Sequence, residues 1–335
     1  MYIVLLTNTN INIISCDTMR SITEDYLYRW GSGEINNDVK FIEFESHSQL
    51  SPQGRMHIIN NTKIYRTFLP LVDVFAIMNY TQDSFSDGGV YVDVDKFFEQ
   101  MITHINHGAQ IIDIGVESTN PQSQPMHSSE EIKRLSLIID TAIEIKTKYK
   151  VLLSIDTYHN ETVKWLLDKD IDIINDVSGN VDNDLIKILT NSARKYVAMH
   201  SMTIPANPQV HIPLETNPVE FILSWMQNKL LQFDKHNIPL ENIVLDVGIG
   251  FGVNAPQSWY ILKNLDKFKI LPCEILVGHS RKSFINHVHE IQPIHRDMAT
   301  SIIGTNIPNN VDYLRLHNVE MFYVTYRINN ELCDY

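Results

Sequence analysis

Short apolar runs recur along this chain, and each ends at or near a polar residue that can take part in chemistry. Segments with helical periodicity separate most of these runs. A regular alternation of buried strand and amphipathic helix is typical of a (β/α)8 barrel, the TIM-barrel fold. We expect eight strands, at residues 74–78, 110–114, 152–155, 171–174, 196–199, 243–245, 274–277 and 313–316. We expect helices at residues 93–107, 128–148, 160–167, 183–192, 218–236, 255–265, 295–303 and 319–329.

The polar residues at the strand ends are acids and amides early in the chain and bases late in it. In a barrel the carboxyl ends of all strands meet at one face, so these side chains are expected to surround one site. Such a ring suits an enzyme that binds a polar heterocycle beside a phosphate. The candidates at the strand ends are Asn79, Asp113, Asp156, Asn175, His200, Asp246, His279, Ser280, Arg315 and His317.

Residues 1–70 lack this rhythm, although residues 1–6, 11–15 and 40–45 favour strands. The chain has 335 residues, more than the roughly 250 of a typical barrel, so an additional segment is expected. We therefore predict an N-terminal extension of unknown role at residues 1–70 and a barrel at residues 71–335.

The formal net charge of −13 argues against bulk binding to nucleic acid or to acidic membranes, which requires a basic face. An anionic substrate must meet a local basic pocket, for which Arg281–Lys282 and Arg315–His317 are candidates. No apolar stretch approaches the roughly 18–20 residues of a membrane span, and the apolar start lacks a basic leader. Three scattered cysteines without a CxxC pair suggest reduced thiols and a cytoplasmic protein.

Two loops after early strands carry groups that can bind ions. Residues 79–89 mix amides, hydroxyls, two carboxylates and a Gly-Gly pair, so this loop can coordinate a cation and close over a substrate. A capped surface turn explains the same composition equally well. Residues 117–121 offer hydroxyls and an amide to phosphate oxygens, but taken alone they fit an ordinary βα loop somewhat better.

An acid and an amide, Asp156 and Asn175, end neighbouring strands and together can read donors and acceptors on a planar ring. Each also suits a helix cap, and that alternative stays open. Asp246 precedes the glycines of residues 248–252, where Phe251 offers a packing face. These glycines do not have the GxGxxG spacing or its Rossmann context, so dinucleotide binding is rejected.

The late basic groups are placed for an anion. Residues 278–283 combine a cationic pair with hydroxyls after a strand. Strand alternation points Arg315 and His317 to the same side, and phosphate sites in barrels often follow strands seven and eight. A surface or satisfied core position is the alternative for each histidine, and we reject it only for His317.

Seven motifs in this order closely resemble the dihydropteroate synthase family of folate biosynthesis. The resemblance covers residues 75–324, about three quarters of the chain, and the motifs together are highly specific whereas one alone is weak. They are NxTxDSFSDGG at 79–89, ESTxP at 117–121, SIDT at 154–157, IINDVSG at 173–179, LDxGxGFG at 245–252, SRKS at 280–283 and RxH at 315–317.

The resemblance implies a transferase that condenses 7,8-dihydropterin-6-ylmethyl diphosphate with p-aminobenzoate, giving 7,8-dihydropteroate and diphosphate. Diphosphate would leave first, and Asp87 would stabilise the resulting cationic methylene. Lys282, Arg315 and His317 complete the implied catalytic set. By the same resemblance, the residues that bind the pterin are Asp156, Asn175, Met199, Asp246 and Lys282. Those that border the aminobenzoate are Phe85, Phe251 and Ser283. Those that contact diphosphate are Asn79, Thr119, Arg315 and His317, and Asn79 also binds Mg²⁺.

Several positions depart from the family pattern, mostly in the loops rather than in the pterin site. Gln82 stands where Pro is usual and Asn120 where Arg is usual; the other departures are Gln122, Val253 and Asn318. A non-catalytic pterin-binding paralogue is therefore one alternative. A methyltetrahydrofolate methyltransferase with a corrinoid partner is another, opposed by SRKS and DSFSDGG because a methyl donor carries no diphosphate. The resemblance also implies a homodimer formed through late barrel helices.

Overall fold

The computed structural model describes residues 72–80, 94–117, 126–190, 192–207, 209–307 and 311–333, together with three N-terminal strands. By its internal contacts the chain separates into two compact units, Met1–Val72 with Val324–Tyr335, and Asp73–Tyr323. In the first unit, β1 (Tyr2–Leu6) pairs antiparallel with both β2 (Ile11–Ser15) and β3 (Lys40–Phe44). The predicted division at residue 70 and the role of the extension stay predictions.

The second unit is a closed barrel of eight parallel strands, which confirms the predicted (β/α)8 fold. Going round the barrel, the order is β10-β11-β4-β5-β6-β7-β8-β9, so each strand lies beside its neighbours in sequence and the last pairs with the first. The strands are β4 (Asp73–Asn79), β5 (Ile111–Gly115), β6 (Leu152–Asp156), β7 (Ile173–Asp176), β8 (Lys195–Met199), β9 (Ile243–Asp246), β10 (Glu274–Val277) and β11 (Tyr313–Leu316).

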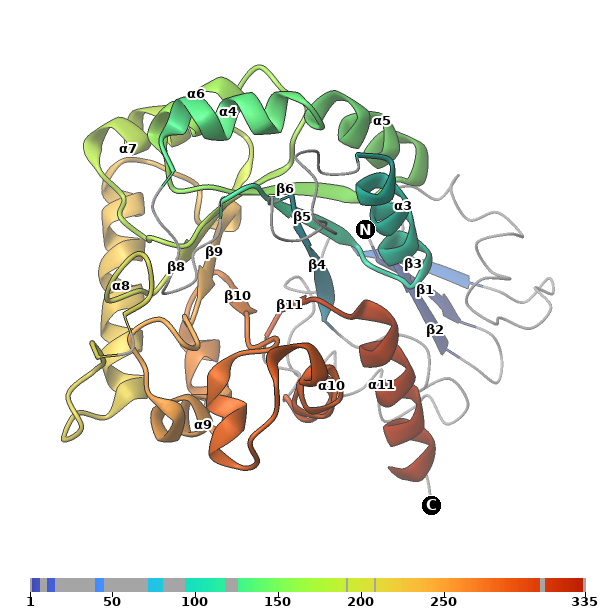
Figure 1. Ribbon diagram of the computed structural model, residues 1–335, viewed down its shortest axis with the longest axis vertical. Coiled ribbons are helices and arrows are strands. Elements are labelled where there is room, and N and C mark those ends of the chain that lie inside the picture. The colour runs from blue at the N-terminus through green and yellow to red at the C-terminus, as the bar shows by residue number, and fades with distance from the viewer. Residues whose placement is uncertain are drawn as a thin grey trace. The chain divides into compact units, whose positions relative to one another are not determined.

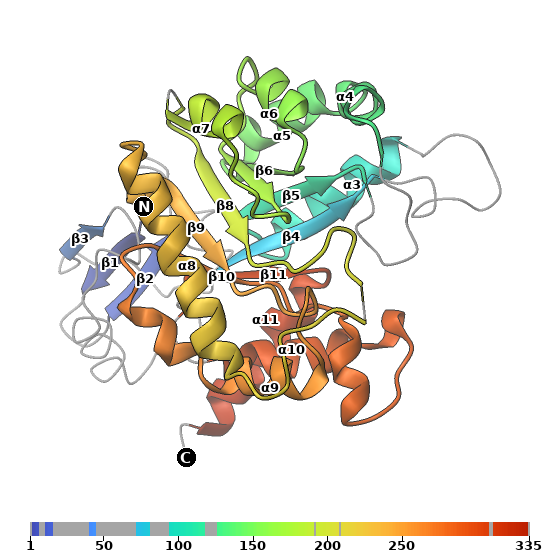
Figure 2. The same ribbon diagram turned by 90° about the vertical axis from the view of Figure 1, so that its left-hand side faces the viewer.

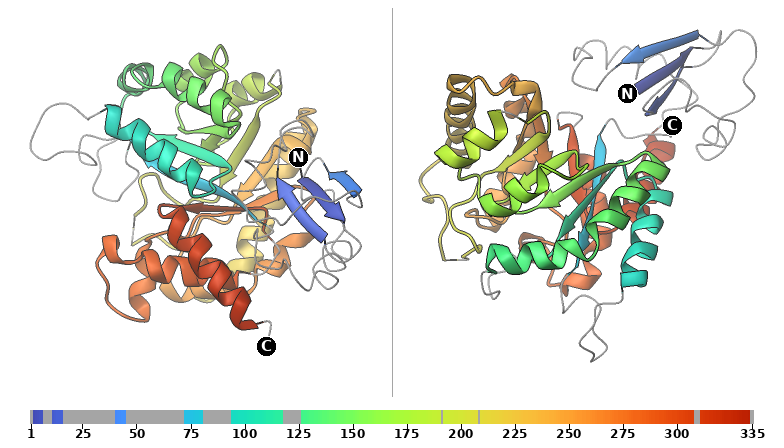
Figure 3. Two further views of the ribbon diagram at one scale, coloured as in Figure 1. Left: turned by 90° about the vertical axis from the view of Figure 1, so that its right-hand side faces the viewer. Right: turned by 90° about the horizontal axis from the view of Figure 1, so that it is seen from above.

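Helices cover the outside of the barrel (Figure 1). Helices α4 to α7 lie along one side of the strands, and α9 and α10 lie along the opposite side (Figures 2 and 3). The helices are α3 (Val94–Asn106), α4 (Ser128–Ser136), α5 (Ile139–Tyr149), α6 (Asn160–Leu166), α7 (Asn183–Thr190), α8 (Pro218–Lys235), α9 (Ala255–Lys263), α10 (Asp297–Asn306) and α11 (Val319–Cys333). Short 3-10 helices are η3 (Leu240–Asn242), η4 (Leu265–Ile270), η5 (Ser283–His287) and η6 (Pro293–His295). Among the described residues, no helix is both long enough and apolar enough to cross a membrane.

The helix predicted at residues 128–148 is in fact two helices, α4 and α5. At the break the backbone of Leu137 and Ile138 makes i→i−3 hydrogen bonds, and Ile138 leaves the helical region with φ −125°. Ile138 and Ile139 are both buried whereas Leu137 is exposed, so the break lets two consecutive isoleucines face the interior. The side chain of His127 caps the start of α4 by accepting from the backbone N–H of Ser129.

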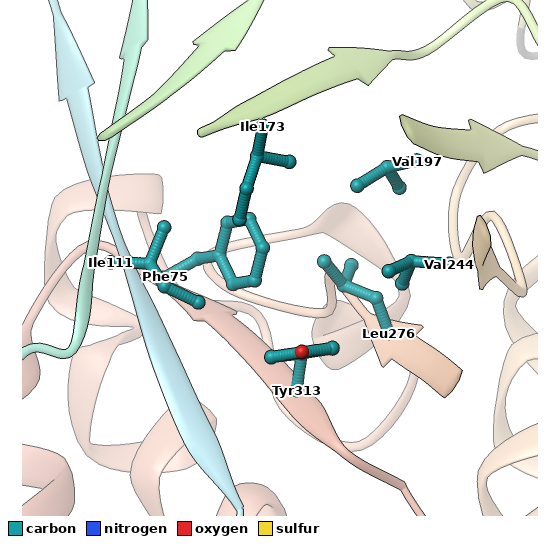
Figure 4. Close-up of a cluster of buried hydrophobic side chains, with 7 residues drawn as sticks. All are labelled: Phe75, Ile111, Ile173, Val197, Val244, Leu276 and Tyr313. Carbon is teal, nitrogen blue, oxygen red and sulfur yellow. The ribbon is translucent and has the colours of Figure 1, made fainter. Parts of the chain in front are cut away.

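The barrel interior is filled by apolar side chains from seven of its eight strands (Figure 4). Within this layer the rings of Phe75 and Tyr313 meet edge to face, with centroids 5.2 Å apart. Close packing of such a layer fixes the strands relative to one another, because voids and overlaps both cost stability. The layer consists of Phe75, Ile111, Ile173, Val197, Val244, Leu276 and Tyr313.

At the amino ends of the strands, polar side chains lie next to this apolar layer. Lys195 forms an ion pair with Glu274, and the Tyr313 hydroxyl donates to the same carboxylate at 2.9 Å. Lys195 Nζ also lies 2.9 Å from the Tyr313 hydroxyl. The charges of Lys195 and Glu274 are therefore paired with each other. The groups available for ligand binding are those at the other end of the barrel, where the strands have their carboxyl ends.

His104 on α3 provides a test of stability against pH. Its side chain is buried, and neither ring nitrogen has a hydrogen-bond partner among the described residues. Burial, aided by the nearby charges of His107 and Arg281, lowers the pKa of His104 from 6.5 to about 4. The folded protein therefore keeps this imidazole neutral in a range where the unfolded chain protonates it, and stability is lost as pH falls below about 6.5.

We expect His104→Leu to stabilise the protein, and the gain to grow by about 2 kcal/mol between pH 7 and pH 5. The measurement is chemical denaturation of both proteins at each pH. Ile105→Val changes packing on the same helix without removing a titrating group, so its cost should be equal at both pH values. A gain from His104→Leu that does not change with pH would show that the imidazole is not held neutral.

Candidate functional site

The strand register places the last or near-last residues of four neighbouring strands in one row at the mouth of the barrel, and three of them, Asn79, Asp156 and Asn175, are predicted site residues. Asn79 pairs with Gly115, Gly115 with Asp156, and Asp156 with Asn175. A Cβ atom on Gly115 would lie 3.5 Å from the Asp156 Cβ and 3.6 Å from the Asn79 amide oxygen. The glycine therefore leaves the two polar side chains close together with little bulk between them.

Arg315 on β11 bridges two carboxylates across this mouth. Its Nε donates to Asp113 Oδ2 at 2.6 Å, and its Nη2 donates to Asp156 Oδ2 at 2.5 Å. Burial raises the pKa of Asp156 to about 7, with Arg315 opposing and Asp113 adding to the rise. The guanidinium stays protonated, because the charges of Asp113 and Asp156 outweigh its own burial and raise its pKa. The carboxylates of Asp113 and Asp156 thus hold the arginine side chain in place.

Asp113 is a functional candidate that sequence analysis noted only as a strand end. Its carboxylate is fully buried and accepts from Ser154 Oγ at 2.6 Å and from Asn175 Nδ2 at 3.1 Å, besides Arg315. It therefore orients both the amide expected to read the pterin and the arginine expected to bind diphosphate. The sequence feature that indicates this role is the position of Asp113 between Ile112 and Ile114 in an otherwise apolar strand, because an acid buried there needs partners.

Asp246 and Lys282 lie on the side of the mouth formed by β9 and β10. Asp246 Oδ1 accepts from the backbone N–H of Gly248 at 2.8 Å, and a Cβ on Gly278 would lie 3.4 Å from its other oxygen. Lys282 Nζ donates to the Ile249 carbonyl and lies 4.4 Å from the centre of the Phe251 ring. Burial lowers the pKa of Lys282 to about 8 although Asp246 opposes this, so the lysine is poised to donate to a ring acceptor.

The His317 imidazole lies beside the Ser280 hydroxyl, just beyond the end of β11. The Ser280 oxygen accepts from the His317 backbone N–H at 3.1 Å and lies 2.9 Å from Nδ1. Burial, together with Arg281 and Arg315, lowers the pKa of His317 to about 3, so this side chain is neutral at physiological pH. It can donate a hydrogen bond to an anion, whereas the fixed positive charge comes from Arg315.

Arg281 is not part of the basic pocket that the sequence suggested. Its Nε and Nη2 donate to the two oxygens of Asp297 at 2.6 and 2.8 Å, in a forked ion pair. Asn318 Nδ2 donates to the same carboxylate at 3.1 Å. The arginine thus fastens the segment after β10 to α10, and the local cation for a ligand is Lys282.

The remaining predicted residues divide into two groups. Met199 is buried at the end of β8, Ser283 is exposed at the start of η5, and Phe251 lies under Lys282. Asp87, Phe85 and Thr119 lie outside the described residues, as do the departures Gln82, Asn120 and Gln122. Their predicted roles stay predictions.

One cluster of described residues has the donor set of a metal site: Glu117, Glu131 and His159, with ligand atoms within 4.8 Å of one another. Within it, Glu117 already accepts from the Tyr158 hydroxyl at 2.6 Å and lies 2.9 Å from His159 Nε2. Glu131 Oε2 accepts from the hydroxyls of Thr157 and Thr162. These contacts tie the segment after β5 to α4 and to the start of α6, which gives the cluster a structural role beside the mouth.

Residues 75–317 match the family described as pterin binding enzymes, a range that includes seven barrel strands completely and β4 from Phe75 onward. The chain belongs to the pterin-binding enzyme family. It is 32% identical over 268 residues to dihydropteroate synthase type-3 of Escherichia coli, covering 77% of this chain and 98% of that protein. It is 33% identical over 248 residues to a probable bifunctional folylpolyglutamate synthase/dihydropteroate synthase of Haloferax volcanii.

This pterin-binding enzyme spans only part of its bifunctional relatives. The matched region is 73% of this chain but 29% of the Haloferax protein, and 76% of this chain but 58% of a folate synthesis bifunctional protein of Chlamydia muridarum. Among solved structures, dihydropteroate synthase of Anaplasma phagocytophilum with bound 6-hydroxymethylpterin-monophosphate superposes with a TM-score of 0.70 at 30% identity. That superposition covers 78% of this chain and 100% of the Anaplasma chain.

The substitution Gly248→Ala tests the backbone conformation of the loop that holds Asp246 and Lys282. The φ of Gly248 is +70°, and an added Cβ would lie 1.9 Å from the His200 carbonyl oxygen, which belongs to the rigid backbone after β8. The backbone conformation alone should cost an alanine about 1–3 kcal/mol, so we expect Gly248→Ala to lower the free energy of unfolding by this amount or more. Gly115→Ala, which makes only ordinary contacts, is the control in denaturant titration. Equal stabilities of the two variants would show that the loop relaxes without cost.

Proposed function

We propose that this protein is a dihydropteroate synthase, a transferase that joins a dihydropterin methyl diphosphate to p-aminobenzoate and releases diphosphate. One observation carries the proposal. The acids and amide expected to read a pterin lie in the same barrel mouth as the arginine and histidine expected to bind diphosphate. The relatives that bear this name, of which the Escherichia coli enzyme is matched over almost its full length, support it.

A pterin ring carries N–H and amino donors on one edge and acceptors on another. The carboxylates of Asp156 and Asp246 would accept from the donors, and Lys282 would donate to an acceptor. Asn175, held by Asp113, adds an amide whose orientation is already fixed. Met199 at the end of β8 would pack against the ring face. Asn175 and Asp246 are buried and Asp156 and Lys282 are half-buried, so a mismatch with the ligand would leave polar atoms unpaired, which makes such a pocket selective.

The diphosphate would lie toward Asn79, Thr119, Arg315 and His317. The Asn79 side chain is exposed at the end of β4 and offers an amide oxygen, a ligand that Mg²⁺ accepts alongside phosphate oxygens and water. When bound there, Mg²⁺ would neutralise charge on the departing diphosphate. Arg315 would supply the fixed positive charge of the protein, and the neutral His317 would donate a hydrogen bond.

The reaction exchanges one bond for another at the pterin methylene. The C–O bond breaks and its electron pair leaves with diphosphate, so positive charge develops on the methylene and spreads into the ring. The amine nitrogen of p-aminobenzoate then attacks, a C–N bond forms and the amine loses a proton. Asp87 would face the developing cation, where a preorganised carboxylate in a closed site acts strongly. Phe85, Phe251 and Ser283 would border the aminobenzoate.

The deciding experiment measures diphosphate release from dihydropterin methyl diphosphate with magnesium, with and without p-aminobenzoate, and detects dihydropteroate. Turnover that yields dihydropteroate supports the proposal and shows that Asn120 is compatible with catalysis. Tight binding of the pterin diphosphate without condensation would instead identify a non-catalytic pterin-binding protein. In that case the altered loop after β5 would be the first place to seek the cause.

Asp156→Asn tests pterin recognition. Removing the charge mismatches the ring donors, so we expect pterin affinity to fall at least roughly ten-fold, the usual effect of losing a charged hydrogen bond. Since burial raises the pKa of Asp156 to about 7, the parent should bind more weakly as pH falls from 8 to 6, and the variant should lose this dependence. Calorimetry with 6-hydroxymethylpterin measures both effects. Asp140→Asn on the exposed face of α5 is the control, and unchanged affinity in Asp156→Asn would remove Asp156 from the site.

Asp87→Ala separates binding from chemistry. We expect pterin diphosphate to bind with parental affinity while single-turnover condensation slows roughly 100-fold, the usual loss for one preorganised electrostatic contact. Asp95→Ala, at the exposed start of α3, should react at the parental rate. Equal rates for Asp87→Ala and the parent would rule out cation stabilisation by this residue.

The proposal extends to assembly and location. We propose a cytoplasmic homodimer that associates through late barrel helices. Met298 and Ile302 on α10 and Ile294 on η6 are exposed, and apolar side chains gathered in this way are typical of an interface. The mass of the protein in solution, measured by light scattering, tests the dimer.

A further inference from the structure

Arg315 has two carboxylate partners, and one of them, Asp156, is also the carboxylate expected to receive the donors of a pterin. We propose that Asp113 is a positioning residue: it holds Nε of Arg315 while Nη2 moves from Asp156 to the diphosphate as the pterin takes its place. This inference rests on the proposed function and adds a coupling between the two halves of one substrate.

The first step is competition for Asp156. Its Oδ2 accepts from Arg315 Nη2 at 2.5 Å, so the guanidinium occupies the carboxylate expected to receive the pterin donors. The ring donors of a pterin resemble a guanidinium in their planar, paired N–H groups. A pterin that pairs with both oxygens of Asp156 therefore competes with Nη2 for Oδ2.

The second step is the anchor. Asp113 is fully buried, and its Oδ1 accepts from Ser154 while its Oδ2 accepts from Asn175 as well as from Arg315 Nε. It lies in the middle of β5, so neither its backbone nor its carboxylate can follow the arginine outward. We call the two contacts of Arg315, Nε with Asp113 and Nη2 with Asp156, the Arg315 clamp. The Nε contact is the part of this clamp that can persist when a pterin binds to Asp156.

The third step is the fate of the released Nη2. The Arg315 side chain is only 19% exposed, so an N–H displaced from Asp156 is poorly solvated unless another acceptor meets it. A diphosphate beside His317 is such an acceptor. Each ligand therefore removes part of the cost of binding the other, and by linkage the effect is equal in both directions. An anion alone meets an arginine that is already paired, so diphosphate is bound more weakly once the pterin portion has left the site.

The coupling can be measured with the two halves of the substrate offered separately. Titration calorimetry gives the Kd of inorganic diphosphate, with magnesium present, without and with saturating 6-hydroxymethylpterin. We expect the pterin to lower the Kd for diphosphate at least five-fold, the lower end of ordinary coupling between sites. The reverse titration should give the same factor.

Two variants test whether the Arg315 clamp causes the coupling between pterin and diphosphate binding. Asp113→Asn keeps the shape of the side chain but removes the charge that anchors Nε, so the factor should fall toward one. The loss of a negative charge changes diphosphate affinity in both arms, and this change cancels in the ratio. Arg315→Lys keeps the positive charge but cannot bridge two acids, so it should also abolish the coupling, and it serves if Asp113→Asn does not fold. Arg194→Lys, an arginine bound to the carbonyls of Leu167 and Lys169 far from the mouth, should keep the full factor.

The outcomes separate this inference from the proposed function. If both ligands bind but independently in the parent, the exchange of Arg315 is wrong while the synthase assignment stands. The inference is also overturned if both variants couple the ligands as strongly as the parent does. If neither ligand binds, the proposed function fails and the inference fails with it.

Discussion

A shortage of positive charge in the barrel mouth governs the site. Two buried carboxylates, Asp113 and Asp246, and the half-buried Asp156 share two cations, Arg315 and Lys282. Burial disfavours an unpaired charge, so the acids must be bridged, hydrogen-bonded or protonated. Arg315 therefore contacts two of them at once, and burial raises the pKa of both Asp156 and Asp246. A ligand that brings several donors relieves this shortage, which makes the mouth receptive to a planar ring with several N–H groups.

The barrel beneath makes this arrangement possible, because polar groups can be buried only where the surrounding frame is rigid. The apolar layer around Phe75 and Tyr313 fixes the register, and the register in turn places Asn79, Gly115, Asp156 and Asn175 in one row. A shift of one residue in any of these strands would turn its polar end out of the mouth. The energy of the hydrophobic layer is thus what holds the acids close together against their repulsion.

The sequence predicted the fold because its signal is local: each apolar run and each amphipathic helix can be recognised alone, and their alternation admits few architectures. The strand-end residues followed, since parallel strands share one end. Pairings across the mouth were not predictable, because they depend on register and on the reach of long side chains. Thus Arg281 was expected in the anion site but binds Asp297, and the role of Asp113 emerged only with its partners. The break between α4 and α5 was missed because the apolar spacing continues through it.

The same charge balance bears on selectivity within a chain of net charge −13. A free anion finds a neutral His317, an Arg281 bound to Asp297, and an Arg315 shared by two acids. An uncharged ring alone must displace a guanidinium and leave it short of partners. A molecule that joins a donor-rich ring to an anion meets neither cost, because its ring replaces the arginine on the acid and its anion receives the arginine. By the proposed exchange of Arg315, the site favours binding a ring and an anion together over binding either of them alone.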